Sequence, residues 1–389
     1  MRAKKRLPLL MHRKNTASND EDKSVYGTCL EMCPEAEFIS RKRDNLLSRF
    51  EKIKEAHDEI QYVALKAYRR PAAGRTEILL HELRPPSVLL DTLRHLFTKI
   101  LQWPNGGFDS PFLSALSTED TFLSLYNFIH DRVRSVRQDF IIQVRKLIAI
   151  NCNIFQFFCQ RIINSTYATA LEWIIRFYIL SFITANAILA EKYHSEWSET
   201  LHQEQLASAL YSLSSLYLAP TMTHTPHKAE MLAYRILYHI DNTEAVSSFL
   251  VSLPRSTLSC PPIARALRFF TSFHCGNYML YGKLLAEATF LEKALLLTHS
   301  VKLFKRAFQI MSKAYNKQSV PLDDVLNWLC GVDRETLVHV CRSLNIEMST
   351  SIHFKIATIS TRESRNEVKS LATYWSSERV DTTECIVKT

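Results

Sequence analysis

The residues best suited to chemistry by type and spacing are two cysteines, Cys29 and Cys33, and two histidines, His224 and His227. Each pair could give two ligands to a metal ion, and zinc in proteins takes about four. The two pairs lie far apart in the chain, and neither has a second ligand pair close by. We therefore expect no metal site, and we expect the cysteines to pack beneath a helix that starts at Pro34.

Motifs of the common catalytic folds are missing from the sequence. It contains no Gly-x-Gly-x-x-Gly, no Gly-x4-Gly-Lys-Ser/Thr, no Gly-x-Ser-x-Gly and no His-Glu-x-x-His. Only seven of the 389 residues are glycine, so few positions let the backbone approach a phosphate closely. We expect a non-catalytic protein with no cofactor and no small-molecule substrate.

The charge balance favours an acidic partner. The chain has 48 Lys and Arg against 39 Asp and Glu, a net charge of +9 and a pI of about 9.0. Nucleic acid and acidic proteins are the partners that such a balance attracts. The basic arm at residues 1–25 has six Lys or Arg and no acid between Arg2 and Lys14. This arm is either a disordered tail or a nuclear-localisation or nucleic-acid patch.

Cysteine usage and hydropathy predict an intracellular, soluble protein. The nine cysteines are odd in number and scattered, which is unlike a secreted disulfide framework. The longest uncharged apolar run, 177–190, is shorter than the ~20 residues that span a bilayer. Arg176 and Glu191 flank it, so we interpret the run as a buried helix and expect no contact with a membrane.

Apolar residues recur at helical spacing over most of the chain, which predicts a mainly α fold. We divide the chain into a basic arm (1–25), a helical-repeat domain (26–318) and a winged-helix end (319–389). No fixed-period repeat is present, but successive helices with short connections predict a right-handed stack of helix pairs. The expected helices cover 36–59, 120–151, 154–165, 167–193, 199–217, 227–240, 243–252, 261–272, 275–287 and 290–316, with a further element after Pro85-Pro86.

The last 70 residues or so change character. Two short helical patterns, near 322–329 and 337–344, flank the turn 331–333, in which Asp333 is a candidate N-cap. Strand-like runs follow at 352–359 and 385–387. Two short helices joined by a tight turn and followed by strands predict a winged helix that closes the stack. The span 363–375 fits either a third helix or a wing.

Two groups of basic residues are candidate nucleic-acid or partner-binding residues. On the predicted helix 120–151, Ile129 and Val133 belong to an apolar face, and Arg134, Gln138 and Arg145 lie roughly opposite, with Arg137 nearer the boundary. This side is either a solvated face with an internal pair between Asp131 and Arg134, or a surface for an acidic partner or RNA. The second group would bind phosphate or pack against protein; it comprises Arg334, Arg342, Lys355, Arg362, Arg365 and Lys369.

Several blocks, in order from about residue 25 to 360, resemble the suppressor-of-actin/GANP family of messenger-RNA export scaffolds. Supporting blocks lie at 68–74 and 83–89. The chain departs from the usual pattern at His130, where the family has an aromatic residue, and at Tyr178, where it has a histidine. The signature positions are Gly27, Thr28, Cys29, Met32, Cys33 and Pro34, then Asp131, Arg132, Arg134, Arg137, Gln138 and Asp139.

The resemblance implies a function that the residues alone do not. It implies a PCI-type stack that pairs, winged helix to winged helix, with a second PCI-domain protein, onto which a small acidic proteasome-lid-type protein clamps. The joint basic surface would bind RNA in the nucleus, at the nuclear pore. The chain is expected to be a short, domain-only member. The alternative is a scaffold at the centrosome and spindle, in centrosome duplication and mitotic progression, which acts through protein contacts only.

Overall fold

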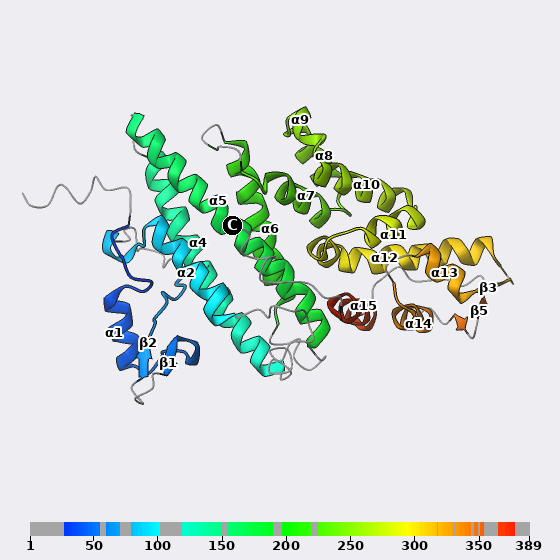
Figure 1. The fold of residues 1–389 in the computed structure, drawn as a ribbon, viewed down its shortest axis with the longest axis horizontal. Helices are drawn as coiled ribbons and strands as arrows, with labels where there is room; N and C mark the ends of the chain where they lie inside the picture. The colour runs from blue at the N-terminus through cyan, green and yellow to red at the C-terminus, as the bar shows by residue number, and fades with distance from the viewer. Residues whose placement is uncertain are drawn as a thin grey trace, which may run out of the picture.

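The protein is an elongated, mainly helical molecule, as the sequence predicts (Figure 1). Its structure is a computed structural model. Side chains within 53–60, 119–121, 145–149 and 154–163 are not described. The residues that the structure describes are 27–54, 60–70, 79–101, 119–149, 154–189, 197–219, 222, 225–316, 318–329, 332–343, 346–348, 351–353 and 365–377.

The first part of the chain differs from the prediction of one helix over 36–59. The helix ends at Arg43, because Asn45 takes a left-handed conformation (φ 52°). Ser48 and Glu51 then form a capping box that starts a 3-10 turn. An antiparallel strand pair follows, with Lys52 opposite Tyr62. The elements are α1 (Glu35–Arg43), η2 (Arg49–Glu51), β1 (Lys52–Lys54), β2 (Ile60–Tyr62), η3 (Leu80–Glu82), α2 (Pro86–His95) and η4 (Leu96–Ile100).

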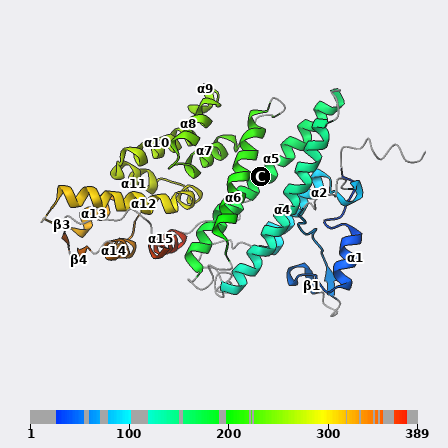
Figure 2. The ribbon, with the colours of Figure 1, turned by 180° about the vertical axis from the view of Figure 1, so that it is seen from behind.

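Three long helices form the centre of the molecule: α4 (Glu119–Ala149), α5 (Ile154–Ile188) and α6 (Glu199–Leu218). Helix α5 lies between α4 and α6 and also contacts α2 (Figure 2). Its segment Asn164–Ile188 is long and apolar enough to cross a membrane by composition, but 94% of the apolar window is buried inside the protein. The expectation of a buried helix in this region is confirmed, but the separate helices expected over 154–165 and 167–193 are one continuous helix that ends at Ile188.

Of the next six helices all but α12 are shorter than the three central ones, and several begin or end at residues with a known capping preference. Pro261 starts α10, and Gly276, with a φ of 68°, ends it. A capping box between Thr289 and Glu292 starts α12. The elements are α7 (Lys228–Tyr238), α8 (Thr243–Val251), α9 (Arg255–Leu258), α10 (Pro261–Cys275), α11 (Tyr278–Ala286) and α12 (Phe290–Ala314).

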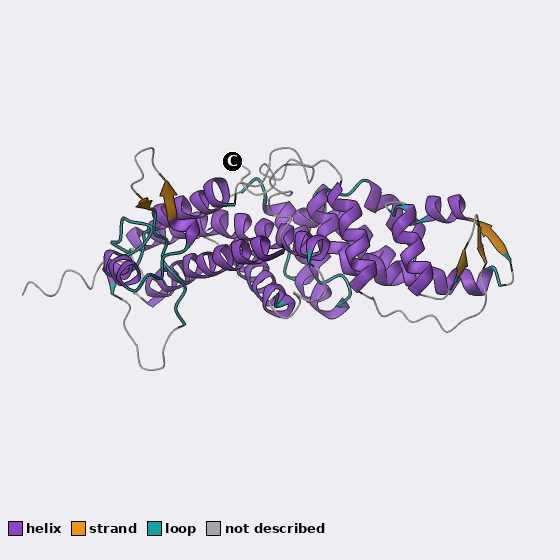
Figure 3. Ribbon diagram, turned by 90° about the horizontal axis from the view of Figure 1, so that it is seen from below, coloured by secondary structure: helices purple, strands orange, loops and turns teal. Residues whose placement is uncertain are grey.

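The C-terminal module, defined as residues 319–353, combines two short helices with a small sheet at the end opposite β1 and β2 (Figure 3). The strand order is β3-β5-β4, and both pairs are antiparallel. Asp333 accepts hydrogen bonds from the amides of Glu335 and Thr336, so its predicted N-cap role is confirmed. The elements are β3 (Ser319–Pro321), α13 (Leu322–Trp328), α14 (Arg334–Ser343), β4 (Glu347–Met348) and β5 (Ser351–His353).

A last helix, α15 (Arg365–Ser377), returns to the stack. The span 363–375, which the sequence left open, is therefore helix over its described part, and 385–387 lies outside the described residues. Helix α15 packs against α5, α12 and α14, and Trp375 is fully buried. Lys305 Nζ on α12 lies 2.8 Å from Glu367 Oε2, and both side chains are at most 4% exposed. This buried ion pair joins α15 to the stack.

Removing one charge of this pair should destabilise the protein strongly. A buried charge without its partner costs about 3–5 kcal/mol, so we expect Glu367→Gln to lower the free energy of unfolding by that order, as measured by urea denaturation. The double variant Lys305→Met/Glu367→Leu removes both charges and should recover most of the loss. The exposed Glu335→Gln serves as control. A Glu367→Gln variant as stable as the wild type would contradict the role of the pair.

Candidate functional site

Helix α4 carries the most distinctive sequence block, and its polar side faces the N-terminal layer, defined as the described residues from 27 to 101. Gln143 accepts a hydrogen bond at Oε1 from the amide of Gly27 (3.1 Å) and donates from Nε2 to the carbonyl of Arg84 (3.0 Å). A Cβ at Gly27 would lie 2.2 Å from the carbonyl oxygen of Leu83. This close approach of two backbones therefore requires glycine.

A buried carboxylate, Asp139, joins α4 to two separate segments of the N-terminal layer. Its Oδ1 lies 2.8 Å from Lys66 Nζ, and its Oδ2 lies 2.8 Å from Arg84 Nε. Arg84 also donates to Ser135 Oγ (3.0 Å) and to the carbonyl of Met32 (3.2 Å). Arg84 and Asp139 side chains are 0% and 1% exposed. Desolvating such a pair is offset only when hydrogen bonds satisfy the remaining polar atoms, as they do here.

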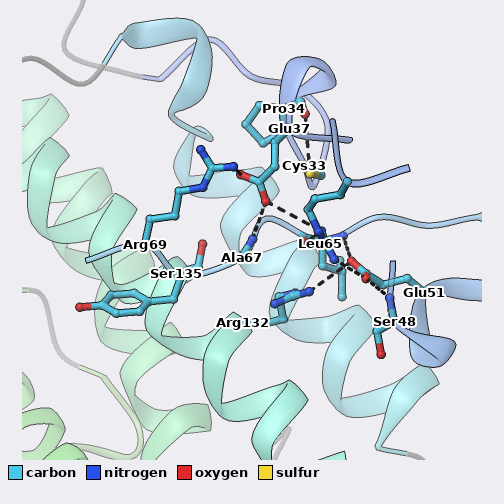
Figure 4. Close-up of polar contacts among 12 residues, drawn as sticks. Cys33, Pro34, Glu37, Ser48, Glu51, Leu65, Ala67, Arg69, Arg132 and Ser135 are labelled. Atoms are coloured by element: carbon cyan, nitrogen blue, oxygen red, sulfur yellow. Dashed lines mark hydrogen bonds and ion pairs between the residues drawn. The ribbon is translucent and has the colours of Figure 1, made fainter. Parts of the chain in front are cut away.

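A second buried carboxylate, Glu51, organises the layer itself (Figure 4). Arg41 Nη2 donates to Oε2 (2.5 Å), and the amides of Leu65 and Ser48 donate to Oε1 (2.8 Å) and Oε2 (2.9 Å). Arg132 of α4 lies 3.5 Å from Oε1. Burial alone would raise the pKa of Glu51, but the hydrogen bond from Arg41, the other donors and Arg132 outweigh burial and lower it.

The segment 60–70 covers the side of α4 that the sequence assigned to solvent or to a partner. Asp131 Oδ2 accepts from the amide of Tyr68 (3.1 Å), and Gln138 Nε2 donates to the carbonyl of Arg69 (3.0 Å). The guanidinium of Arg134 lies 3.9 Å from the centre of the Tyr68 ring, a cation–π contact. Three of the signature residues, Asp131, Arg134 and Gln138, therefore contact this segment.

The prediction that α4 presents a ridge of accessible guanidinium groups is corrected by these contacts. Arg137 is 6% exposed and donates to Gln205 Oε1 (3.0 Å) and Ser208 Oγ (2.9 Å) of α6. Arg134 is half-buried, and Asp131 pairs with Arg132 instead of Arg134. The helical wheel identifies the face that turns away from the apolar core, but it cannot show which distant segment covers that face.

The two signature cysteines are buried thiols. Cys29 and Cys33 are 8% and 6% exposed, and Pro34 is the N-cap of α1, so the expected burial of the cysteines and the expected start of the helix are confirmed. Burial raises the pKa of Cys33 to about 12 and also raises the pKa of Cys29. Both are protonated at neutral pH and are poor nucleophiles. Among the described residues, no three His, Cys, Asp or Glu side chains converge on a metal position.

The basic residues of the C-terminal group do not form one cluster in the described part of the chain. Arg334 and Arg342 are exposed on α14. Lys369 is half-buried on α15, where its Nζ donates to the carbonyl of Leu189 at the end of α5 (3.5 Å). Arg365 starts α15, but its side chain, like that of Arg145, is not described. Lys355 and Arg362 lie outside the described residues.

The sequence analysis did not identify Lys66 or Glu51 as residues that hold the N-terminal layer. It also did not predict that the side-chain amide of Gln143 binds backbone groups of that layer. The contacts that join them to other segments span long stretches of chain: 14 positions from Glu51 to Leu65, 73 from Lys66 to Asp139 and 116 from Gln143 to Gly27. No local spacing marks these pairs. The one available signal was a run of charged and amide residues on the face of α4 opposite its apolar stripe.

A sequence model of the SAC3/GANP family matches residues 32–350. The chain belongs to the SAC3/GANP family. It is 28% identical over 343 residues to SAC3 family protein 1 of Schizosaccharomyces pombe, 23% over 332 to SAC3 family protein B of Arabidopsis thaliana, and 23% over 299 to Protein xmas of Drosophila melanogaster. These matches cover 82%, 82% and 75% of this chain, but only 29%, 17% and 13% of the relatives.

His130 and Tyr178, which the sequence analysis noted as departures from the resemblance, meet in space. The rings of His130 on α4 and Tyr178 on α5 contact edge to face, with centroids 5.8 Å apart. Tyr126 stacks on His130 and bonds through its hydroxyl to His202 Nδ1 of α6 (2.9 Å). This box of rings joins the three central helices.

Protonation of the box should destabilise the SAC3/GANP fold. Burial, aided by Arg134 and Arg137, lowers the pKa of His130 to about 4; burial and His130 lower that of His202 to about 3. In the unfolded chain each imidazole titrates near 6.5. The unfolded state therefore binds more protons than the folded state below pH 6.5, and stability falls as pH falls towards 4, by about 1.4 kcal/mol per pH unit for each group.

Urea denaturation at pH 7.5 and 5.5 checks this linkage. We expect the wild type to lose stability at pH 5.5, and His130→Phe, which keeps a ring but cannot protonate, to lose about 1 kcal/mol less. His81→Gln, which changes an exposed histidine, is the control and should behave as the wild type. Equal stability of the wild type at both pH values would contradict the assignment of a neutral imidazole box.

Proposed function

We propose that the protein is a non-catalytic nuclear scaffold of the messenger-RNA export type, built as a PCI-like helical stack closed by a winged helix. The observation that carries the proposal is the C-terminal module. Helices α13 and α14 follow each other closely in the chain and are accompanied by the antiparallel sheet β3-β5-β4. Two short helices with such a sheet are typical of winged-helix modules, in which the second helix is exposed for binding.

The scaffold role is supported by how the chain uses its charged residues. The signature residue Asp139 is held by Lys66 and Arg84, and Glu51 of the N-terminal layer is held by Arg41, by backbone amides and by the signature residue Arg132. These carboxylates fix the N-terminal layer to α4, and their ion pairs are buried. The family's most distinctive residues therefore serve to hold a shape, which suits a protein whose surfaces bind other macromolecules.

The proposed partners follow from the family resemblance. The C-terminal module would pair with the winged helix of a second PCI-domain protein, and a small acidic proteasome-lid-type protein would bind that second protein. RNA contact would come from the exposed side of α14, where Arg334 and Arg342 can each form a bidentate contact with phosphate. Glu335 is exposed on the same helix, so the number of phosphates contacted by α14 is small.

One observation favours the alternative, a centrosomal or spindle scaffold that uses protein contacts only. The guanidinium groups of Arg132 and Arg137 are committed to contacts inside the protein. They add nothing to a phosphate-binding surface, and this leaves fewer basic residues for RNA than the sequence suggested.

RNA binding measured at several salt concentrations separates the two functions. For the full-length chain and a fluorescent single-stranded RNA, the logarithm of affinity should fall linearly with the logarithm of salt, by about 0.7 per phosphate contacted. Arg334→Glu/Arg342→Glu should weaken binding and reduce the slope by about 1.4, the contribution of two contacts.

The matched control is Lys283→Glu/Lys313→Glu, which makes the same charge change at exposed residues of α11 and α12. It should retain the wild-type slope. A wild type that binds no RNA, together with a tagged protein at the spindle poles, would overturn the export proposal in favour of the alternative.

A further inference from the structure

A cleft of about 530 Å³ lies where α5 and α6 meet the end of α7 and α12. Ile179, Leu206 and Leu295 give it apolar walls, and Gln203 and Thr298 add an amide and a hydroxyl. This volume and this mixture of apolar walls with a few polar groups are typical of small-ligand sites. None of its lining residues belongs to the contacts between α4 and the N-terminal layer.

Flat side chains are unusually frequent in the cleft. Five of the 15 lining residues carry rings. His202 is 1% exposed and belongs to the ring box, and Phe182 stacks on it from the cleft side. Tyr238, His239 and His299 are the other three rings of the lining. Rings of this kind bind planar ligands by stacking, as they do with unpaired bases of single-stranded RNA. A planar heterocycle is therefore the ligand shape that the walls suit best.

The polar groups at one side of the cleft suit a ligand that donates hydrogen bonds. Asp241 Oδ2 lies 3.6 Å from Lys302 Nζ and 3.7 Å from His299 Nδ1. Both distances exceed that of a direct hydrogen bond, so the Asp241 carboxylate, which is 46% exposed, retains acceptor capacity towards a ligand. Lys302 places a cation beside it.

A metal ion is a poorer fit than an organic ligand, although three histidines line the cleft. In the part of the chain that the structure describes, no group of three His, Cys, Asp or Glu side chains could hold one. The imidazoles are spread around the walls, which favours ring contacts over coordination.

We propose that this cleft binds a nucleobase that carries an exocyclic amino group, with cytosine as the simplest case. The amino group would donate to the Asp241 carboxylate, as carboxylates accept from cytosine N4, and the ring would stack on the aromatic walls. Uracil carries a carbonyl oxygen where cytosine carries the amino group. It would therefore place an acceptor, with no hydrogen to donate, opposite the Asp241 carboxylate. Where the base belongs to RNA, this inference rests on the RNA contact of the proposed function.

Calorimetric titration of the full-length chain with cytidine and uridine monophosphates tests the cleft, because the two ligands differ chiefly at the amino position. We expect CMP to bind about fivefold more tightly than UMP. Asp241→Asn replaces an acceptor by an amide that can donate, so it should abolish or reverse this preference. Asp323→Asn, at an exposed carboxylate of α13, is the matched control and should keep it.

A variant that fills the cleft distinguishes specific binding in the cleft from non-specific binding and from loss of the fold. Ala207→Phe adds a ring to the wall of the cleft and should abolish binding of both nucleotides while the melting temperature shows a folded protein. No binding of either nucleotide at millimolar concentration, or an unchanged preference in Asp241→Asn, would overturn the inference.

Competition identifies the source of the base. An oligocytidine that displaces CMP, when oligouridine does not, assigns the cleft to a base of an RNA strand; CMP that no oligonucleotide displaces assigns it to a free nucleotide. The inference and the proposed function fail separately, because Arg334→Glu/Arg342→Glu changes RNA binding on α14 and leaves CMP binding unaltered. If the protein binds RNA but neither nucleotide, the inference about the cleft is overturned and the proposed function is unaffected.

Discussion

The buried carboxylate of Asp139 is the contact on which the arrangement of the N-terminal half depends. It accepts from Lys66 and Arg84, which lie in two different segments of the N-terminal layer. Within the described part of the chain, Asp139 is the carboxylate that both cations share, and its side chain is 1% exposed. Because a buried charge without a partner is costly, these segments and α4 are stable only together.

This constraint explains why the signature residues of the SAC3/GANP family are charged and yet internal. Gly27, Gln143 and Arg84 fix the backbone of the layer to α4, and Glu51 with Arg132 adds a second buried pair. The surfaces left for partners are then elsewhere: the exposed side of α14 for the proposed RNA contact, and the ring-lined cleft between α6 and α12 for a base. Such a protein acts by presenting surfaces in a fixed geometry.

Sequence periodicity predicted what depends on local interactions. The long helix near 120–151, the start of α10 at Pro261 and the N-cap at Asp333 all follow from side-chain spacing or backbone preference. Sequence periodicity failed where contacts with distant segments determine the local structure. The charged run 36–59 reads as one helix, yet the left-handed Asn45 ends it and β2 pairs with β1. Likewise, nothing near Arg137 indicates that α6 covers it.

Hydrogen exchange of the Asp139→Asn variant tests this account most directly. Asparagine keeps the shape of the side chain but leaves Lys66 and Arg84 without a counter-charge. We predict that backbone amides within 27–86 lose protection, while those of α10 and α12 exchange as in the wild type. Unchanged protection of the N-terminal layer would contradict the central role of this carboxylate, as would a loss of protection that is equal along the whole chain.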